Sequence, residues 1–248
     1  MPYATNQGVQ LYYEIIGQGS PIILIHSFFS DREDWKEFGY VERLQSDYQL
    51  ILLDVRGRGA SDKPHHPGAY SLKLLVEDIV LILDDLNLKK THYLGYSMGG
   101  WIGFGMAKYA ANRLSSLMIG GAHPYASNKG HLRRRYSQIR EEWEAQIESM
   151  EIPALFRARV LKNDLQALLA AAQDRADMSD VLATISVPCL VYAGEADEPV
   201  YPRAKQCVSQ IANATFLSLP SLNHGDAYLQ SELILPHLIN FLTSIDSP

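Results

Sequence analysis

Short, uninterrupted apolar runs alternate with amphipathic segments along most of this chain. Residues 21–26 (PIILIH) and 91–96 (THYLGY) are two such runs, and apolar runs of this length are typical of strands buried on both faces. The alternation predicts an α/β fold with a mostly parallel central sheet flanked by helices. The expected strands are 9–16, 21–26, 48–54, 91–96, 115–121, 187–194 and 214–219, and the expected helices are 35–44, 72–86, 98–111, 200–211 and 226–244, the last divided or restarted at Pro236.

The alternation stops at Gly120-Gly121. Residues 129–150 have apolar side chains at three- and four-residue steps, which predicts an amphipathic helix, and two more helical stretches are expected at 153–161 and 163–176. Because open α/β sheets bind ligands beyond the carboxyl ends of their strands, an insertion at this point is expected to act as a lid. The expected units are a core of residues 1–122 and 186–248 and an all-helical insertion of residues 123–185.

The strand expected at 91–96 leads into Gly95-Tyr96-Ser97-Met98-Gly99 and then into a helix. This is a G-x-S-x-G sequence in the strand–turn–helix setting of a nucleophile elbow. The flanking glycines suit such a turn because a Cβ there would collide with the adjacent strand or helix. Ser97 is therefore the candidate nucleophile, and a glycine-rich turn without a catalytic role is the alternative that the motif alone leaves open.

Two other residues complete a possible catalytic set. His224 lies in the loop after the last expected strand and is the candidate general base. Asp197 follows another expected strand and is the candidate acceptor for the Nδ1–H of His224, whereas Glu195 and Glu198 are expected to be solvated. The chain order Ser97, Asp197, His224, each residue just after a strand, is the order of α/β-hydrolases.

A third motif extends this pattern, because DVRGRGAS at 54–61 matches D-x-R-G-x-G-x-S. Together these motifs make the chain resemble the α/β-hydrolase fold family, in particular its small esterases, lactonases and bromoperoxidase-like members, over nearly its whole length. The resemblance implies an α/β-hydrolase fold with a small all-helical cap inserted after the sixth strand. It also implies that Asp54, Arg56, Gly57 and Gly59 shape a turn and are not catalytic.

The family places an oxyanion loop that usually reads His-Gly-x after the strand at 21–26. Here the loop reads His26-Ser27-Phe28-Phe29. By position, the resemblance implies that the backbone N–H groups of Phe28 and Met98 form the oxyanion hole. Ser27 in place of glycine raises the question of whether the loop is displaced, since loss of one such donor typically costs about 10²–10³ in rate.

The short insertion predicts a compact pocket, which favours short acyl chains or small rings over triglycerides. The loop phenylalanines and aromatic side chains of the insertion are expected to make this pocket largely apolar. The expected lining residues are Phe28, Phe29, Trp101, His123, Tyr125, Tyr136 and Trp143.

The expected activity is hydrolysis of small carboxylic esters or lactones by Ser97 through an acyl-enzyme intermediate. One alternative is a receptor-like or signalling protein that keeps the triad and turns over little. Another is a cofactor-free perhydrolase or a carbon–carbon bond hydrolase. A menaquinone-pathway lyase shows a similar G-Y-S-x-G-G, but it usually has an arginine where this chain has Trp101.

Composition and missing motifs exclude several other functions. The net charge of −6 argues against nucleic acid and anionic membranes as partners. No metal-ligand or dinucleotide motif is present, so no cofactor is expected. With two cysteines and no visible signal peptide, we expect a cytoplasmic protein, acting on small molecules as a monomer or homodimer.

Overall fold

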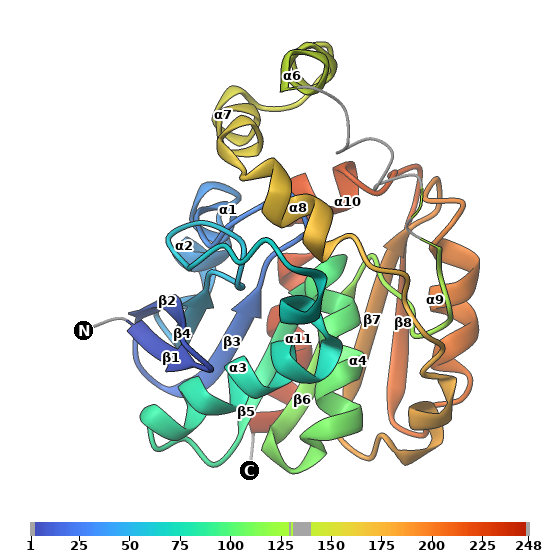
Figure 1. The fold of residues 1–248 in the computed structure, drawn as a ribbon. Helices are drawn as coiled ribbons and strands as arrows, with labels where there is room; N and C mark the ends of the chain where they lie inside the picture. The colour runs from blue at the N-terminus through green and yellow to red at the C-terminus, as the bar shows by residue number, and fades with distance from the viewer. Residues whose placement is uncertain (1–2, 129, 131–139, 247–248) are drawn as a thin grey trace.

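The structure is a computed structural model that describes residues 3–128, 130 and 140–246. In this part of the chain, eight strands form one sheet in the order β1-β2-β4-β3-β5-β6-β7-β8 (Figure 1). Strands β1 and β2, and β2 and β4, pair antiparallel, and the other neighbours are parallel. The strands are β1 (Tyr3–Asn6), β2 (Val9–Ile16), β3 (Ser20–Ile25), β4 (Tyr48–Leu53), β5 (Thr91–Tyr96), β6 (Leu114–Gly120), β7 (Cys189–Gly194) and β8 (Ala214–Leu219).

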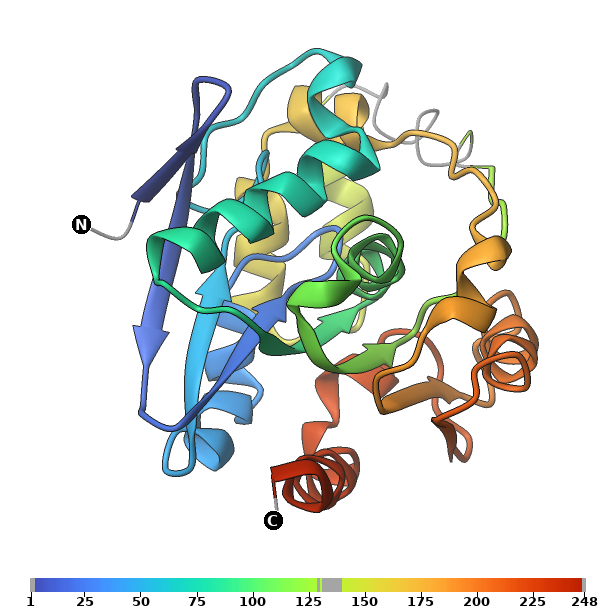
Figure 2. The ribbon, with the colours of Figure 1, turned by 90° about the horizontal axis from the view of Figure 1, so that it is seen from below.

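Helices cover both faces of the sheet, as the second view shows with α3 and α4 on one side and α11 on the other (Figure 2). The predicted α/β-hydrolase fold, with a mostly parallel sheet between helices, is confirmed. The helices are α1 (Glu33–Glu37), α2 (Tyr40–Leu44), α3 (Leu72–Asp85), α4 (Met98–Tyr109), α6 (Arg140–Glu148), α7 (Ala154–Lys162), α8 (Leu165–Ala171), α9 (Tyr201–Val208), α10 (Asp226–Leu229) and α11 (Leu235–Asp246), with short 3₁₀ turns η1 (Pro67–Tyr70), η2 (Ala111–Arg113), η3 (Ser179–Thr184) and η4 (Ser231–Leu233).

The continuous apolar runs form strands because each contributes side chains to the hydrophobic clusters on both faces of the sheet. In β3, Ile23 and Ile25 pack with the cluster under α3 and α4, whereas Ile22 and Leu24 pack with the cluster under α2 and α11. Side chains alternate between the two faces of a strand, so a strand with helices on both sides has no polar face. This sandwich holds the carboxyl ends of the parallel strands in fixed positions along one edge.

Several local features differ from the sequence-based expectations. The helix expected at 163–176 ends at Ala171, and Arg175 instead forms a β-bridge with Ser127. The strand β1 was not expected, because four residues at the sheet edge give too short an alternation to recognise. The single helix expected at 35–44 is wrong: the chain forms α1 and α2, separated by Gly39 with φ of 80°. A left-handed residue interrupts helical hydrogen bonding, and glycine adopts it at little cost.

Between β6 and β7 the described chain contains α6, α7, α8 and η3, and α6 to α8 lie beyond the ends to which the parallel strands point (Figure 1). The insertion has its own apolar cluster, which includes Trp143, Ile147, Val160 and Leu168. The stretch 178–185, by contrast, packs into the cluster of the sheet. The boundaries 123 and 185 remain predictions, and this packing favours an earlier end for the insertion.

Candidate active site

Ser97 stands on the turn between β5 and α4, where its backbone has φ of 53° and ψ of −102°. A non-glycine residue with positive φ is strained, and such strain persists only where the surroundings fix it. Here the N–H of Ser97 donates to the carbonyl of Gly120 on β6 at 2.8 Å. Ser97 is half-buried at the end of a fully buried strand, so the turn presents its hydroxyl at the edge of the sheet.

Glycines next to Ser97 make this turn sterically possible. A Cβ on Gly99 would overlap the carbonyl oxygen of Ile25 in β3, and a Cβ on Gly95 would overlap the carbonyl oxygen of Gly99. Both clashes would be with backbone, which cannot move aside as a flexible side chain can. The G-x-S-x-G spacing is therefore required for the first turn of α4 to pack directly on the neighbouring strand.

His224 lies between Asp197 and Ser97, within hydrogen-bonding reach of each. The Nε2 of His224 is 2.9 Å from the Oγ of Ser97, and its Nδ1 is 2.5 Å from the Oδ2 of Asp197. An ionised carboxylate can only accept, so Nδ1 donates to Asp197 and the neutral ring accepts the Ser97 hydroxyl proton at Nε2. The Asp197 side chain is 5% exposed and that of His224 43%, so the ring alone faces the solvent side.

Tyr96 fixes the loop that carries His224, a role that the sequence did not indicate. Its hydroxyl donates to the backbone carbonyl of His224 at 2.6 Å, and its ring stacks on Tyr228 in α10 with 4.5 Å between the ring centroids. The Tyr96 side chain is buried, and burial raises its pKa well above the usual value. The phenol therefore stays protonated and remains a donor near neutral pH.

The loop after β3 is held by His26, which is fully buried. The Nε2 of His26 accepts the N–H of Val55 at 3.1 Å, so its Nδ1 carries the proton and donates to the carbonyl of Ser27 at 2.7 Å. Burial lowers the pKa of His26, which keeps the ring neutral. In a trans peptide the N–H points opposite to the carbonyl, so this bond sets the direction of the Phe28 N–H.

Ser27 itself fits this loop without strain. Among the described residues, positive φ at non-glycine positions occurs at Gln7, Asn87, Ser97 and Ser221, and Ser27 is not one of them. Its hydroxyl is 2.9 Å from that of Ser30. The backbone conformation at this position therefore does not require a glycine.

The second expected donor, Met98, is the first residue of α4, and N–H groups of a helix's first turn have no intrahelical acceptor. On the other side of the loop, the carbonyl of Phe28 accepts the Nε–H of Arg58 at 2.6 Å, and the guanidinium lies 4.6 Å above the Phe28 ring. Arg58 is buried at 1% exposure. The arrangement provides a hydroxyl, a base and oriented backbone donors at one edge of the sheet.

The D-x-R-G-x-G-x-S turn after β4 supports this loop through its side chains. The carboxylate of Asp54 accepts the backbone N–H groups of Arg32 and Ala60 at 2.9 and 2.7 Å. Arg56 donates to both carboxylate oxygens of Asp78 in α3 at 2.6 Å, and both side chains are buried. These contacts hold the turn in place and do not involve Ser97 or His224.

Ser97 and His224 open into a cavity of about 270 Å³. Phe28, Phe29 and Trp101, expected as lining residues, do line it. Described lining residues that the sequence did not indicate include Arg58, Tyr70, Gln173 and Arg175. Arg58 belongs to the motif at 54–61 and could have been suspected, whereas no local pattern marks Tyr70, Gln173 or Arg175.

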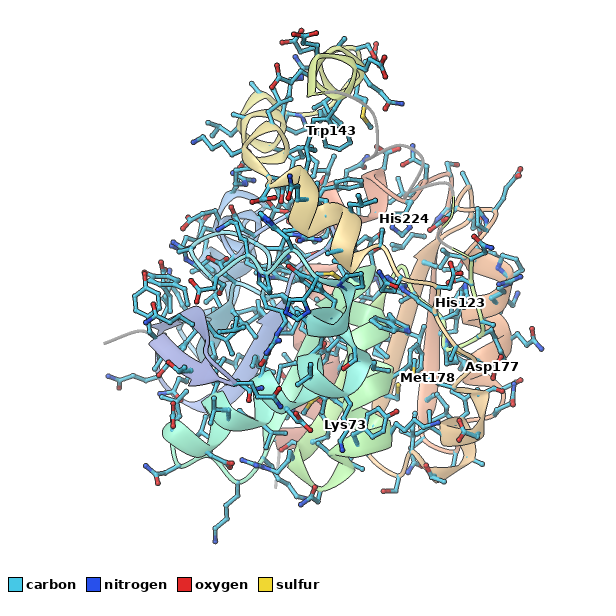
Figure 3. All side chains as sticks on the ribbon, in the orientation of Figure 1. Lys73, His123, Trp143, Asp177, Met178 and His224 are labelled. Carbon is cyan, nitrogen blue, oxygen red and sulfur yellow. The ribbon has the colours of Figure 1, made fainter. Side chains whose placement is uncertain are left out.

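Four other expected lining residues do not line this cavity or cannot be placed. His123 and Tyr125 lie at the start of the insertion, where Tyr125 accepts a hydrogen bond from Gln210 beyond α9 at 2.8 Å. Trp143 is fully buried between α6 and α7, at the top of the view and away from His224 (Figure 3). It instead stacks on the outer side of Phe29, with 5.7 Å between ring centroids. Tyr136 lies outside the described residues.

Comparison with known proteins assigns the family. The sequence model of the alpha/beta hydrolase fold matches residues 20–149, slightly more than half of the chain. The chain belongs to the α/β-hydrolase fold family. It is an esterase- and lactonase-like hydrolase, as expected from its motifs.

Individual relatives cover most of this α/β-hydrolase. The 3-oxoadipate enol-lactonase 1 of Acinetobacter baylyi is 29% identical over 77% of this chain and 77% of its own length. The non-heme haloperoxidase of Rhodococcus erythropolis is 24% identical over 98% of this chain and 100% of its own. The crystal structure of the enol-lactonase from Burkholderia xenovorans has a TM-score of 0.87, with 23% identity over 98% of this chain and 100% of its own, and shows the shared fold.

Two further observations concern cofactors and membranes. Within the described ranges, no group of three or more His, Cys, Asp and Glu side chains is placed to hold a metal ion. None of the helices formed by the described residues has the length and apolar character needed to cross a membrane.

Proposed function

We propose that this α/β-hydrolase cleaves small carboxylic esters or lactones through an acyl-enzyme on Ser97. The Oγ of Ser97 attacks the carbonyl carbon while His224 Nε2 takes its proton, and Asp197 stabilises the resulting imidazolium. The backbone N–H groups of Met98 and Phe28 bind the oxyanion. His224 then protonates the leaving alkoxide, and a water activated by His224 releases the acid and regenerates Ser97.

The single observation that carries this proposal is the hydrogen-bonded series from Asp197 through His224 to Ser97, with the hydroxyl opening into a cavity. The Nδ1 of His224 faces Asp197 and its Nε2 faces Ser97, which supports the role of general base. The unstrained backbone at Ser27 supports a competent oxyanion site, and so favours turnover over a receptor-like role. A cavity of about 270 Å³ is at the small end of ligand pockets, which supports compact substrates.

The decisive experiment is stopped-flow hydrolysis of p-nitrophenyl acetate and butyrate by the wild type and by Ser97→Ala. The wild type should show a burst of p-nitrophenol followed by steady turnover. Ser97→Ala should lose roughly 10⁶-fold in kcat, because loss of a nucleophile of this kind has that effect. Wild-type rates in Ser97→Ala would disprove the proposal.

A matched control separates chemistry from folding. Ser209 lies just after α9, where its hydroxyl donates to the carbonyl of Gln206 at 2.8 Å and does not line the cavity. Ser209→Ala should keep wild-type rates, and a fluorophosphonate should label Ser97 in the wild type and in this control. A burst without subsequent turnover would instead favour the receptor-like alternative.

The haloperoxidase relative favours one side reaction of the same site. In perhydrolysis, hydrogen peroxide in place of water attacks the acyl-enzyme, which yields a peracid and free Ser97. The reaction needs no group beyond those already named. Halide oxidation that depends on hydrogen peroxide, a carboxylic ester or acid, and Ser97 would establish it, and halide oxidation in Ser97→Ala would exclude it.

A further inference from the structure

Arg175 presents a cationic side chain at the cavity, and no acidic side chain of the described residues pairs with it. It follows α8 and lines the same cavity as Ser97 and His224. Its backbone exchanges two hydrogen bonds with Ser127, at 3.0 and 2.9 Å. Among the described residues its guanidinium makes no hydrogen bond or ion pair, and the residues outside the described ranges include no aspartate or glutamate.

The guanidinium is held over an aromatic side chain. It lies 4.6 Å above the ring centroid of Trp101, which is one helical turn after Ser97 in α4. Such stacking orients the planar fork and leaves its N–H edge available. The buried indole N–H of Trp101 also has no acceptor in the described part of the chain. The Arg175 guanidinium is therefore positioned at the cavity by the Trp101 ring, with no acceptor supplied by the described side chains.

The charged side chains of the cavity wall also favour an anion in the cavity. The described residues that line it include Arg56, Arg58 and Arg175, but no aspartate or glutamate. Arg56 is neutralised by Asp78, whereas Arg175 is not neutralised in this way. Arg175 as a whole residue is half-buried, and desolvation of its guanidinium lowers its pKa to about 10, which leaves it cationic at neutral pH. A partly desolvated cation without a counter-ion is unfavourable, and a bound anion would offset that cost.

We propose that the substrate carries a carboxylate, which pairs with Arg175 while the ester or lactone carbonyl lies at Ser97. The proposal rests on the proposed function and names its substrate class as monoesters or lactones of dicarboxylic acids. The carboxylate is bound and not consumed: water cleaves the acyl–oxygen bond and yields the alcohol and the dicarboxylate. A guanidinium fork matches a carboxylate in bidentate geometry, and the Arg175 fork lies on the wall of the cavity that contains Ser97.

The test compares two esters of similar shape, monomethyl glutarate and methyl 5-methylhexanoate, in which an isopropyl group replaces the carboxylate. Hydrolysis is followed by pH-stat for the wild type and Arg175→Gln. The wild type should favour monomethyl glutarate in kcat/KM. Arg175→Gln should lose about 10- to 100-fold on monomethyl glutarate, the usual worth of a hydrogen-bonded charge pair, and less than about threefold on the neutral ester.

The matched control is Arg157→Gln. Arg157 lies in α7 of the same insertion, donates to the carbonyl of Met150 at 2.7 Å and does not line the cavity. This variant should keep the wild-type ratio of the two esters. Arg175→Lys, which keeps the charge but not the fork, should retain part of the preference.

Wild-type enzyme alone provides a second measurement that does not depend on the variants folding. Glutarate should inhibit p-nitrophenyl acetate hydrolysis competitively and at least tenfold more strongly than the neutral diamide glutaramide. Equal inhibition by the two, or a wild-type preference for methyl 5-methylhexanoate, would overturn the carboxylate proposal. Stronger inhibition by inorganic phosphate than by glutarate would also overturn it, in favour of a phosphate group.

Failure of this proposal is distinguishable from failure of the proposed function. If p-nitrophenyl acetate is hydrolysed through Ser97 but the two methyl esters react equally, the carboxylate proposal is wrong and the serine hydrolase stands. If Ser97→Ala hydrolyses all three esters at wild-type rates, the proposed function is wrong, and the carboxylate proposal falls with it.

Discussion

The edge of the sheet that carries Ser97 and the insertion above it are held by different kinds of interaction. At the edge, backbone atoms decide the geometry: Ser97 N–H bonds to the Gly120 carbonyl, and Gly99 packs against the backbone of β3. The insertion is tied to the core largely by side chains. The positions of the reacting groups therefore depend on the backbone of the fold, whereas substrate choice, in our proposal, depends on a side chain of the insertion.

Two arginines of the insertion make the difference concrete. Arg159 in α7 forms ion pairs with three acidic residues in α1 or just before it, Asp31, Asp34 and Glu37. Its Nη2 is 2.5 Å from the Oδ1 of Asp34. Arg175 has no such partner among the described residues and faces the cavity. The same residue type therefore fastens the insertion at one end and, in our proposal, binds substrate at the other.

Among changes to the contact between the insertion and the core, Arg159→Gln is expected to cause the largest loss of stability. The change leaves the carboxylate of Asp34, which is fully buried, without its cation. Loss of one partner of a buried pair typically costs about 3–5 kcal/mol. We expect the free energy of unfolding, measured by urea denaturation at pH 8, to fall by about this amount.

Arg157→Gln is the control, because it is the same substitution in the same helix and removes one bond to a backbone carbonyl. It should cost about 1 kcal/mol or less. If the two variants lost equal stability, Arg159 would not be the attachment, and the contrast with the sheet edge would fail.

The ion pair between Arg159 and Asp34 can also be tested by measuring the free energy of unfolding as a function of pH. Burial raises the pKa of Asp34 from 3.8 to about 6, despite the neighbouring Arg159. The folded state therefore binds this proton more tightly than the unfolded state does. Stability from Asp34 is fully present below about pH 4 and is lost as pH rises through 6, by about 3 kcal/mol in total.

The measurement is the unfolding free energy of the wild type and Asp34→Asn between pH 4 and 8. The lowered pKa of His26 gives an opposite slope, since stability from that ring is gained as pH rises, but it is common to both proteins. The difference between the two curves should therefore change by about 3 kcal/mol across the range. Parallel curves would show that Asp34 titrates normally in the folded protein.

The smallest effect is expected at the sheet edge, from Ser27→Gly. The carbonyl of Ser27 is held by His26, and its backbone is unstrained, so removal of the side chain leaves the Phe28 N–H in place. We expect kcat for p-nitrophenyl acetate to change by less than about threefold. A rise of 10²-fold or more, the usual worth of one oxyanion donor, would mean that the serine displaces this loop.

Much of the architecture was predictable because its signals are local. Apolar runs such as 21–26 alternate between two cores, and the G-x-S-x-G turn requires small residues within a few positions of Ser97. The separation of α1 from α2 escaped prediction, because Gly39 sits within an otherwise helical pattern and one glycine does not by itself end a helix.

The fold family and the order of Ser97, Asp197 and His224 could be read from the chain, because both follow from short-range periodicity and turn chemistry. The tertiary structure alone decided that His26 orients the Phe28 peptide and that Tyr96 holds the carbonyl of His224. It also decided which arginine is paired and which faces the cavity. Those outcomes depend on contacts between residues up to 128 positions apart, as for Tyr96 and His224, and no local pattern encodes such a distance.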